Sequence, residues 1–321
     1  MKIRYKRDHF AKLLGFTDRQ LTAADKMPEL KALEGGPDSY QPRHLSAYRR
    51  VLDRHPSREP LRRQLFLNFK GGTGKTSLSV AYAYRLAEMG HRVLLVDLDS
   101  QGHATQHLGL LSENLERTVF DALVGGVPLE EVTVGTALLE FDVVPANLRM
   151  TTLDISLMPM AGREYKLQRA LAQVSDRYEF IVMDAPPSFG LLNLNALMAT
   201  DDLLVPVLPD FLSFHGLKLL FETLGQLEDD LNHRLQRIKV IINQFNPTTR
   251  IAREAKKALE AHYSEFLSDT IVRQCTQFAR ASSDGLPITA YAPASKGARD
   301  IDALITEMIS ARLERAMERS A

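Results

Sequence analysis

The stretch Asn68-Phe69-Lys70-Gly71-Gly72-Thr73-Gly74-Lys75-Thr76 decides the fold of this chain, because its spacing is that of a phosphate-binding loop. Closely spaced glycines let the backbone bend so that several N–H groups point at one anion, and the helix that follows adds its positive end. We expect Lys75 to reach the β- and γ-phosphates of a nucleotide, and the Thr76 hydroxyl to complete a Mg²⁺ shell. The remaining nucleotide contacts are predicted at Lys70, Gly71, Gly72, Thr73, Gly74 and Ser77.

Lys70 is the unusual residue of this loop. The ordinary pattern is G-x-x-x-x-G-K-[ST], whereas here Phe69 stands at the first glycine and a lysine follows it. A loop that already has Lys75 does not need a second cation for its own nucleotide. Lys70 therefore requires a separate explanation.

The flanks of the loop support the prediction. Leu65-Phe66-Leu67 is a short apolar run that fits a buried parallel strand, and residues 77–87 have a helical pattern that ends at Gly90. Strand, glycine-rich loop and helix in this order are the context that the motif requires.

Length and composition set the limits of the interpretation. The chain has 321 residues, 45% hydrophobic and 25% charged, enough for one large α/β domain with an appendage. Its single cysteine, Cys275, excludes an intramolecular disulfide and indicates a reducing compartment, and we expect it to be a small packed residue. We expect a cytoplasmic protein, since no apolar run approaches the ~20 residues of a membrane span and the N-terminus lacks the apolar core of a signal peptide.

Charge is distributed unevenly along the chain. The net charge is zero, but residues 1–63 hold 15 Lys and Arg against 8 Asp and Glu, so this segment is at +7 and the remainder at −7. A basic segment joined to a mildly acidic domain indicates contact with a polyanion. Two prolines and many charges in residues 54–63 predict a linker, so we divide the chain into residues 1–53, the linker, and a domain over 64–321.

Beyond the linker, apolar runs alternate with helical patterns, which predicts a mostly parallel sheet with helices on both faces. The predicted strands after the first are 92–98, 141–144, 180–184, 202–206 and 237–242. The predicted helices are 118–124, 162–174, 191–199, 216–227, 250–266 and 298–317. A nucleotide should bind at the carboxyl ends of these strands.

Two further segments carry carboxylates at strand ends. Asp97 and Asp99 follow the apolar run 93–96, and the alternation of a strand puts them on the same side of the chain. One carboxylate can reach Mg²⁺-bound water while the other orients an attacking water. Asp184 ends the run 180–183 in the Walker B arrangement and should hold Mg²⁺ through a water. The prolines and Gly190 that follow suit a loop that moves on hydrolysis.

The first module has the pattern helix, tight turn, helix over 9–14 and 17–26, with Thr17 and Gln20 as a capping box. A turn or wing over 34–40 and a helix that Pro42 opens complete a small α-rich unit, which resembles the winged helix-turn-helix of MerR-type regulators. Arg19, Lys26 and Arg43 are its predicted DNA contacts. A dimerisation, linker or protein-adaptor module remains the alternative.

With these motifs in place, the chain from about Gln64 onward resembles the ParA family of partition ATPases, in the deviant Walker A group that includes MinD. The resemblance implies an ATP-dependent homodimer with DNA and a ParB-like partner that stimulates slow ATP hydrolysis, in plasmid or chromosome partition at the nucleoid. It implies that Lys70 crosses the dimer interface to the partner's nucleotide, and that loss of Asp99 blocks hydrolysis but not ATP binding. It also suggests that Asn243 contacts adenine, with an ordinary strand-end asparagine as the open alternative. The catalytic residues are thus predicted as Lys70, Lys75 and Asp99, and the metal residues as Thr76, Asp99 and Asp184. The N-terminal extension is similar to that of the larger plasmid-type ParA proteins, which suggests an autorepressor.

The chain also departs from the family pattern. Gln277 stands where many members have a DNA-binding arginine, and a basic surface could be rebuilt from Arg250, Arg253, Lys256, Lys257, Arg273, Arg280, Lys296 and Arg299. The amphipathic last helix could bind membrane as in MinD, but its glutamates favour packing against the sheet. Two alternatives to partition are open: positioning of a protein assembly, such as a chemoreceptor cluster or carboxysome, and a MinD-like spatial regulator. One cysteine cannot hold the cluster of a nitrogenase-type iron protein.

Overall fold

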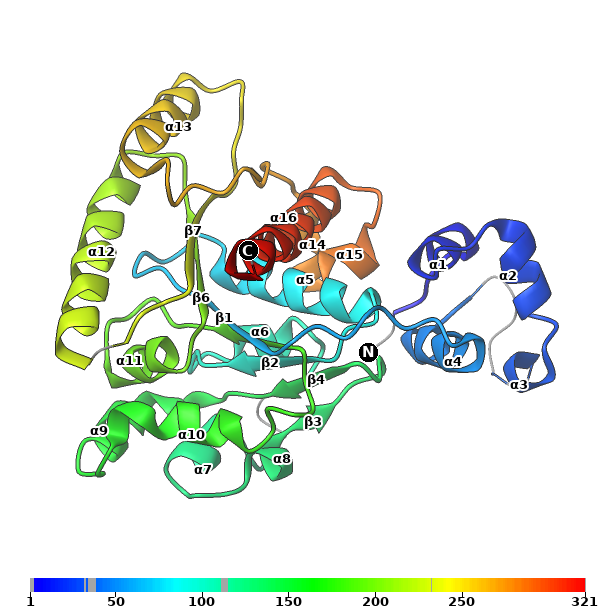
Figure 1. Ribbon diagram of the computed structural model, residues 1–321, viewed down its shortest axis with the longest axis horizontal. Coiled ribbons are helices and arrows are strands. Elements are labelled where there is room, and N and C mark those ends of the chain that lie inside the picture. The colour runs from blue at the N-terminus through cyan, green and yellow to red at the C-terminus, as the bar shows by residue number, and fades with distance from the viewer. Residues whose placement is uncertain (1–2, 32, 34–38, 111–114, 232, 321) are drawn as a thin grey trace.

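The computed structural model describes the chain except residues 1–2, 32, 34–38, 111–114, 232 and 321, and it leaves out the side chains of residues 311–320. A small helical module lies beside a larger domain in which helices cover both faces of one sheet (Figure 1). No helix of the described residues combines the length and apolarity that a membrane crossing requires. The predicted wing falls mostly on residues 34–38, outside the described residues.

The sheet has seven strands in the order β3-β4-β2-β5-β1-β6-β7, and all neighbouring pairs are parallel except β3 with β4. This confirms the predicted mostly parallel α/β fold. The strands are β1 Arg62–Phe66, β2 Val93–Asp97, β3 Val134–Gly135, β4 Phe141–Val144, β5 Phe180–Asp184, β6 Asp202–Val207 and β7 Arg237–Ile242. The short antiparallel β3 lacks a periodic pattern and was not predicted.

Helices surround the sheet in two layers. Those of the large domain are α5 Lys75–Glu88, α6 His103–Gln106, α7 Val119–Leu123, α8 Leu129–Val132, α9 Leu153–Leu157, α10 Lys166–Ala172, α11 Leu191–Met198, α12 Leu212–Leu231, α13 Arg250–Tyr263, α14 Gln277–Ser283, α15 Ile288–Tyr291 and α16 Lys296–Ser320, with 3₁₀ turns η2 Leu148–Thr152 and η3 Arg163–Tyr165. The predicted helices are present with shifted ends, whereas α6, α8, α9, α14 and α15 are too short for a periodic signal.

Alternating residues of the strands contribute their side chains to two apolar clusters, one on each face of the sheet. Phe66 packs with α5 and α16 on one face, and Leu65 and Leu67 pack with α10 and α11 on the other. The last helix buries Ile301, Leu304, Ile305 and Met308 in the first cluster, which confirms that its apolar face packs against the domain.

Strand β1 begins at Arg62, inside the predicted linker, so that part of the linker prediction was wrong. Arginines enter the strand because carboxylates of neighbouring segments pair with them. Arg63 pairs with Asp201 at 2.8 Å, and Arg62 pairs with Asp202. Since Asp201 and Asp202 lie about 140 residues away, nothing local in the sequence marked these two arginines as strand residues.

The N-terminal module consists of α1 Arg7–Leu13, α2 Asp18–Ala24, α3 Pro28–Lys31 and α4 Pro42–Leu52. The predicted capping box is present: Thr17 accepts from the Gln20 amide, and the Gln20 side chain accepts from the Thr17 amide. Gly15 makes the turn between α1 and α2 at a φ of 66°, and an antiparallel bridge joins Tyr5 to Tyr40. The helix, tight turn and helix of the prediction are therefore present.

The module packs against the C-terminal end of α5. Tyr5 Oη lies 2.8 Å from Tyr84 Oη and donates to Glu88 Oε1 at 2.9 Å. The buried Arg49 donates to the carbonyls of Ala87, at 3.4 Å, and Glu88, so its positive charge caps the negative end of α5. Module and domain thus share one apolar cluster.

Candidate functional site

The phosphate-binding loop joins β1 to α5 in the conformation that its glycines predict. Gly72 and Gly74 have φ values of 74° and 88°, which L side chains rarely adopt. At Gly74 a Cβ would also lie 2.2 Å from Nδ2 of Asn243. The loop therefore needs glycine at position 74 for two independent reasons.

Three segments meet over a hollow of about 470 Å³ at the carboxyl ends of the strands. Register places Asp184 of β5 beside both Phe66 of β1 and Asp97 of β2, so the turns that follow these strands converge. Of the predicted residues, Gly71, Gly72, Gly74, Lys75, Thr76, Ser77 and Asp99 line the hollow. Ser100, Gln101, His103, Pro186, Pro187 and Ser188 also line it and were not named as contacts, although the turns that carry them were recognised.

Lys75 stands at the base of this hollow. Its ammonium donates to the Lys70 carbonyl at 3.2 Å, and the residue is only 6% exposed. Burial lowers the pKa of Lys75, and the neighbouring Asp184 and Asp99 partly offset this effect. A phosphate anion in the hollow would supply the negative charge that this buried cation requires.

Asp184 fits a cation ligand. The residue is fully buried, and neither carboxylate oxygen has a well-formed hydrogen bond within the described residues. Burial, with a contribution from Asp97, raises the pKa of Asp184 to about 8, although the nearby side chains of Thr76, Ser79 and Lys75 lower it in part. Buried carboxylates with so little hydrogen bonding are rare in folded proteins, and a divalent ion beside Thr76 would satisfy this one.

The two carboxylates of the second motif have different surroundings. Asp97 is buried and accepts from the amide and hydroxyl of Thr105, at 2.8 and 2.7 Å, and from the amide of Asp99 at 3.1 Å. It therefore holds the loop in place and is not among the residues that line the hollow. Asp99 lines the hollow, as predicted for a residue that orients water.

Lys70 lies beside the hollow and is held within its own subunit. Its ammonium is 2.8 and 3.1 Å from the two carboxylate oxygens of Asp210, in the turn before α12. Burial raises the pKa of Asp210, but Lys70 and Ser213 lower it more, so the net shift is downward. The sequence did not indicate Asp210, which lies 140 residues from Lys70.

Asn243 contacts the loop rather than an open adenine pocket. Its side-chain amide donates to the Thr73 carbonyl at 2.7 Å, and its oxygen accepts from the Gln244 amide at 2.8 Å. It is 4% exposed. Asn243 thus fixes the loop in this structure, and an adenine contact stays a prediction.

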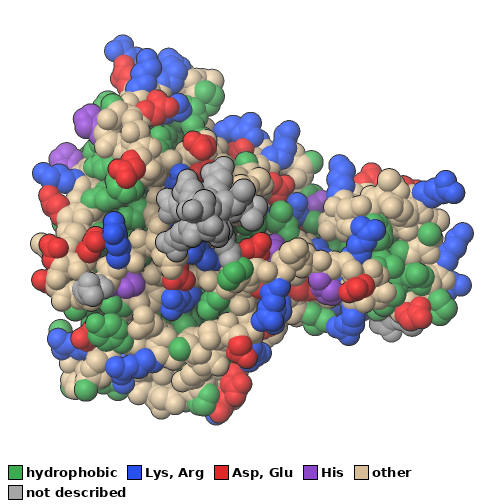
Figure 2. Space-filling model, viewed as in Figure 1, with side chains coloured by type: hydrophobic (Ala, Val, Ile, Leu, Met, Phe, Trp, Pro, Cys, Tyr) green, Lys and Arg blue, Asp and Glu red, His purple; other side chains and the backbone are tan. Residues whose placement is uncertain are grey.

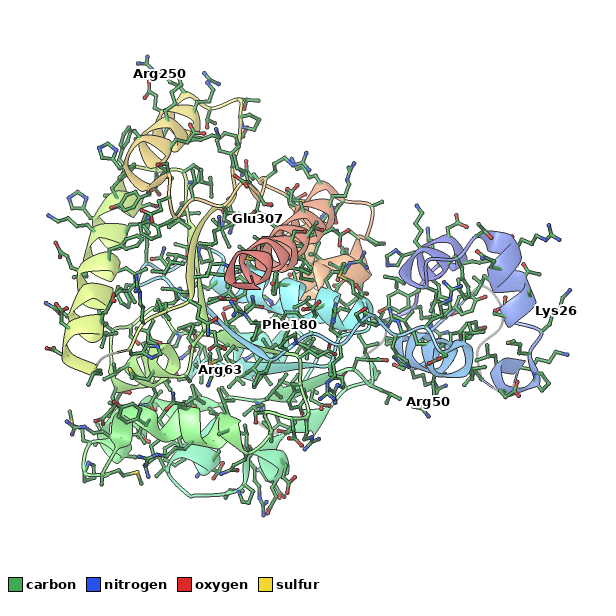
Figure 3. The ribbon with its side chains drawn as sticks, viewed as in Figure 1. Lys26, Arg50, Arg63, Phe180, Arg250 and Glu307 are labelled. Atoms are coloured by element: carbon green, nitrogen blue, oxygen red, sulfur yellow. The ribbon has the colours of Figure 1, made fainter. Side chains whose placement is uncertain are left out.

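The predicted DNA-binding residues lie on separate surfaces. Lys26 is at the outer end of the module and Arg250 at the outer end of the large domain (Figure 3). Blue side chains gather over α13 and around the module in the space-filling view (Figure 2). Arg273 is bound to Asp300, with a closest approach of 2.6 Å, and Arg250 to Glu254 at 2.6 Å, so part of the expected charge is neutralised.

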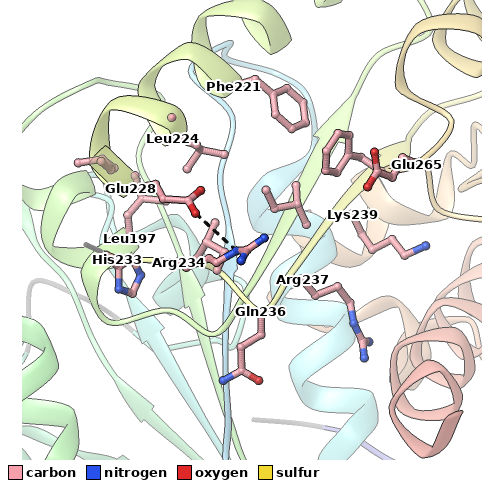
Figure 4. A pocket seen from close by; sticks show the side chains of 15 residues that line it. Leu197, Phe221, Leu224, Glu228, His233, Arg234, Gln236, Arg237, Lys239 and Glu265 are labelled. Carbon is pink, nitrogen blue, oxygen red and sulfur yellow. Dashed lines mark ion pairs between the residues drawn. The ribbon is translucent and has the colours of Figure 1, made fainter. Parts of the chain in front are cut away.

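A second hollow, of about 730 Å³, lies between α12 and the start of β7 (Figure 4). Its wall is mixed: Phe221 and Leu224 of α12 lie on one side, and polar and charged side chains such as Lys239 line the rest. An ion pair joins Glu228 to Arg234 at 3.5 Å. None of the three predicted motifs contributes to it. The chemistry predicted from the sequence therefore belongs to the hollow at the phosphate-binding loop.

Comparison with known proteins agrees with this geometry. Residues 64–237 match the model of a family described as AAA domain. The chain is 55% identical over 305 residues to the cell division protein PomZ of Myxococcus xanthus, covering 95% of this chain and 92% of that protein. It is 35% identical over 231 residues to the sporulation initiation inhibitor protein Soj of Bacillus subtilis, covering 72% and 91%. A crystal structure of cobyrinic acid a,c-diamide synthase from Mycobacterium smegmatis, with a bound ATP analogue and magnesium, superposes with a TM-score of 0.67 at 29% identity, covering 78% and 97%.

Proposed function

Because this chain belongs to the ParA/MinD family of partition ATPases, we propose that it hydrolyses ATP slowly, dimerises around ATP and uses this cycle to position a cellular cargo. The observation that carries the proposal is the hollow in which the phosphate-binding loop, Asp99 and the loop after Asp184 meet, with a second lysine, Lys70, at its side. Lys75 already supplies the cation for the nucleotide of its own subunit, so Lys70 is the cation that a second subunit could use.

In this proposal each group of residues in the hollow has its own role. The loop amides and Lys75 hold the phosphates, and Thr76, Asp99 and Asp184 would hold Mg²⁺, whose charge would neutralise the β- and γ-phosphate oxygens as ADP leaves. Asp99 orients the attacking water. Lys70 leaves Asp210 and contacts the nucleotide of the partner subunit, so that two cationic loops approach each other only when the phosphate charge lies between them.

The proposed cargo follows from how much of this chain each relative matches. The match to the cell division protein leaves only 16 of the 321 residues unmatched, so it must include most of the N-terminal module. The 231 residues matched to Soj, in contrast, could all come from the large domain. We therefore favour positioning of the division machinery over the partition of DNA with a ParB-like partner. Chromosome partition is the second candidate, since the chromosome partitioning protein ParA of Myxococcus xanthus and the chromosome-partitioning ATPase Soj of Treponema pallidum are 33% and 32% identical to this chain.

DNA is the proposed track for this positioning. The exposed basic side chains of the N-terminal module, such as Arg19 and Lys26, and those over α13 supply two cationic surfaces. On this proposal the protein lies on the nucleoid, and the module either adds to non-specific binding or binds an operator. The packed apolar face of α16 argues against membrane binding.

Three variants test the ATPase cycle. Lys75→Ala should abolish ATP binding, Asp99→Ala should bind ATP and remain a dimer, and Lys70→Ala should bind ATP as a monomer. Size-exclusion chromatography with multi-angle light scattering measures each state. A monomeric Asp99→Ala protein at saturating ATP would refute the ATP-dependent dimer. Gel shifts with upstream DNA against random DNA then distinguish an operator-binding module from an adaptor, since an adaptor shows no sequence preference.

A further inference from the structure

The loop of residues 185–190, between β5 and α11, is held at its far end by a carboxylate from another element. Asp154 of α9 accepts a hydrogen bond from the Leu192 amide at 2.9 Å. No side chain of the N-cap residue Gly190 is available for this purpose, so Asp154 caps α11 from outside the helix.

Gly190 is in close contact with the same carboxylate. Its φ of −162° is ordinary extended backbone that any residue adopts. A Cβ there, however, would lie 2.1 Å from Oδ2 of Asp154. The absence of a side chain at position 190 therefore lets the loop close onto Asp154.

A second set of contacts joins this anchor to the nucleotide hollow. Asn193, in the first turn of α11, is 1% exposed and donates to the carbonyl of Pro186 at 3.1 Å and to that of Ser188. Pro186 and Ser188 line the hollow. The end of the loop that faces the nucleotide and the end that faces Asp154 are thus both bonded to the first turn of one helix.

Helix α9 itself is firmly placed. Leu153 and Leu157, on either side of Asp154, are 1% and 0% exposed and lie in the apolar cluster below the sheet. The packing of its own helix therefore holds Asp154 in place independently of the loop that follows Asp184.

We propose that Asp154 is a positioning residue for ATP hydrolysis, which holds α11 and the 185–190 loop where Pro186 and Ser188 close the nucleotide hollow. The proposal rests on the ATPase activity proposed above and on neither DNA nor a partner. Asp154 does not line the hollow, so it acts through the loop and should affect the hydrolytic step more than nucleotide binding.

Asp154→Ala, Asp154→Asn and the control Ser156→Ala test this role. Asparagine keeps an oxygen that can accept from Leu192, whereas alanine does not. Ser156 lies on the same helix, and its hydroxyl bonds only to the Thr152 carbonyl of the adjoining turn among its recorded contacts, at 3.0 Å. Thermal unfolding first establishes a temperature at which all four proteins are folded.

At that temperature we expect Asp154→Ala to slow single-turnover ATP hydrolysis at least tenfold, with the Kd for ATP within about twofold of wild type. Asp154→Asn should keep at least half of the wild-type rate, and Ser156→Ala all of it. A folded Asp154→Ala protein with the wild-type rate would overturn the proposal. So would an Asp154→Asn protein as slow as Asp154→Ala, or a loss of ATP affinity equal to the loss of rate.

Hydrogen exchange separates this proposal from the ATPase proposal. In nucleotide-free protein the Leu192 amide should exchange at least tenfold faster in Asp154→Ala than in wild type, whether or not ATP is hydrolysed. Equal exchange in the two proteins would refute the anchor. A wild-type protein that shows the protected amide but no hydrolysis would refute the ATPase proposal, and with it the role of Asp154 in hydrolysis, but not the anchoring of α11 by Asp154.

Gly190→Ala supplies an independent check through the same contact. Its methyl group displaces the Asp154 carboxylate, so hydrolysis should slow about as much as in Asp154→Ala. In the double variant Gly190→Ala/Asp154→Ala the clash is gone, and the rate should be no lower than that of Asp154→Ala alone. Rate losses that multiply in the double variant would show that the two residues act separately and would overturn the proposal.

Discussion

Asp210→Asn is expected to strengthen the ATP-dependent dimer, because it releases the ammonium of Lys70. In the structure Asp210 holds Lys70 within its own subunit at 2.8 Å, while the proposed role of Lys70 is in the partner subunit. In the structure Asp210 accepts a hydrogen bond from the Ser213 amide at 2.9 Å. Asparagine removes the charge but keeps an oxygen that can accept this bond. The start of α12 should therefore stay intact.

The expected magnitude follows from the exposure of the pair. The side chains of Lys70 and Asp210 are 29% and 33% exposed, and an ion pair at this level of exposure contributes about 0.2–1 kcal/mol. Two subunits release two lysines, so the dimer gains about 0.4–2 kcal/mol. With a tenfold change for every 1.4 kcal/mol, the dimer Kd should fall about 2- to 30-fold. Higher salt should reduce the difference.

Sedimentation velocity in saturating ATP and Mg²⁺ measures this Kd, with Asp99→Ala in every protein to prevent hydrolysis. Asp229→Asn is the matched control, because it removes an equal charge at the exposed far end of α12. The reasoning is wrong if Asp210→Asn dimerises no more tightly than the control. It is also wrong if the gain persists after Lys70→Ala, since no lysine is then left to release.

Three further outcomes follow from other contacts. Arg49→Ala leaves buried carbonyls at the end of α5 without their cap and should lower the free energy of unfolding by about 3 kcal/mol, measured by urea denaturation; an unchanged midpoint would contradict this. Burial raises the pKa of Glu179, but bonds from His91 and two backbone amides lower it to about 2. The folded-state pKa is thus below the unfolded one, so this stabilisation is present above about pH 4.5 and is lost as the pH falls toward 2. Glu179→Gln should therefore reduce the loss of unfolding free energy between about pH 4.5 and 2. Asn243→Ala removes the bond to the Thr73 carbonyl and should weaken ATP binding about fivefold, by roughly 1 kcal/mol, in a fluorescent-nucleotide titration; an unchanged Kd would leave that bond without a role in the loop.

The nucleotide hollow was predictable because its signals are local. Glycines at 72 and 74 specify a backbone that other residues avoid, and Asp184 ends an apolar strand, so each motif is complete within about ten residues. The restraints on those motifs were not predictable. Asp210 and Asp154 are ordinary exposed-type residues in the sequence, and only the fold brings them to Lys70 and Leu192.

The same distinction explains the errors at the domain boundary. Charged residues normally indicate surface or linker, but the folded chain can pair them across distant segments and so bury them. Glu88 is fully buried among Arg85 and Tyr5, which a single helical pattern does not show. The contact between the end of α5 and the N-terminal module therefore could not be predicted from the sequence.

Helix α5 is a strut of 14 residues, about 21 Å long, with the phosphate loop at one end and Arg49 of the module at the other. A shortened chain that starts at β1 would expose the Glu88 carboxylate and uncap the last turn of this strut. Such a truncation damages the scaffold of the nucleotide hollow as well as deleting a recognition unit. Point changes at the exposed Arg19 of α2 and at the exposed Lys26 in the turn after it are therefore the sound way to ask what the N-terminal unit recognises.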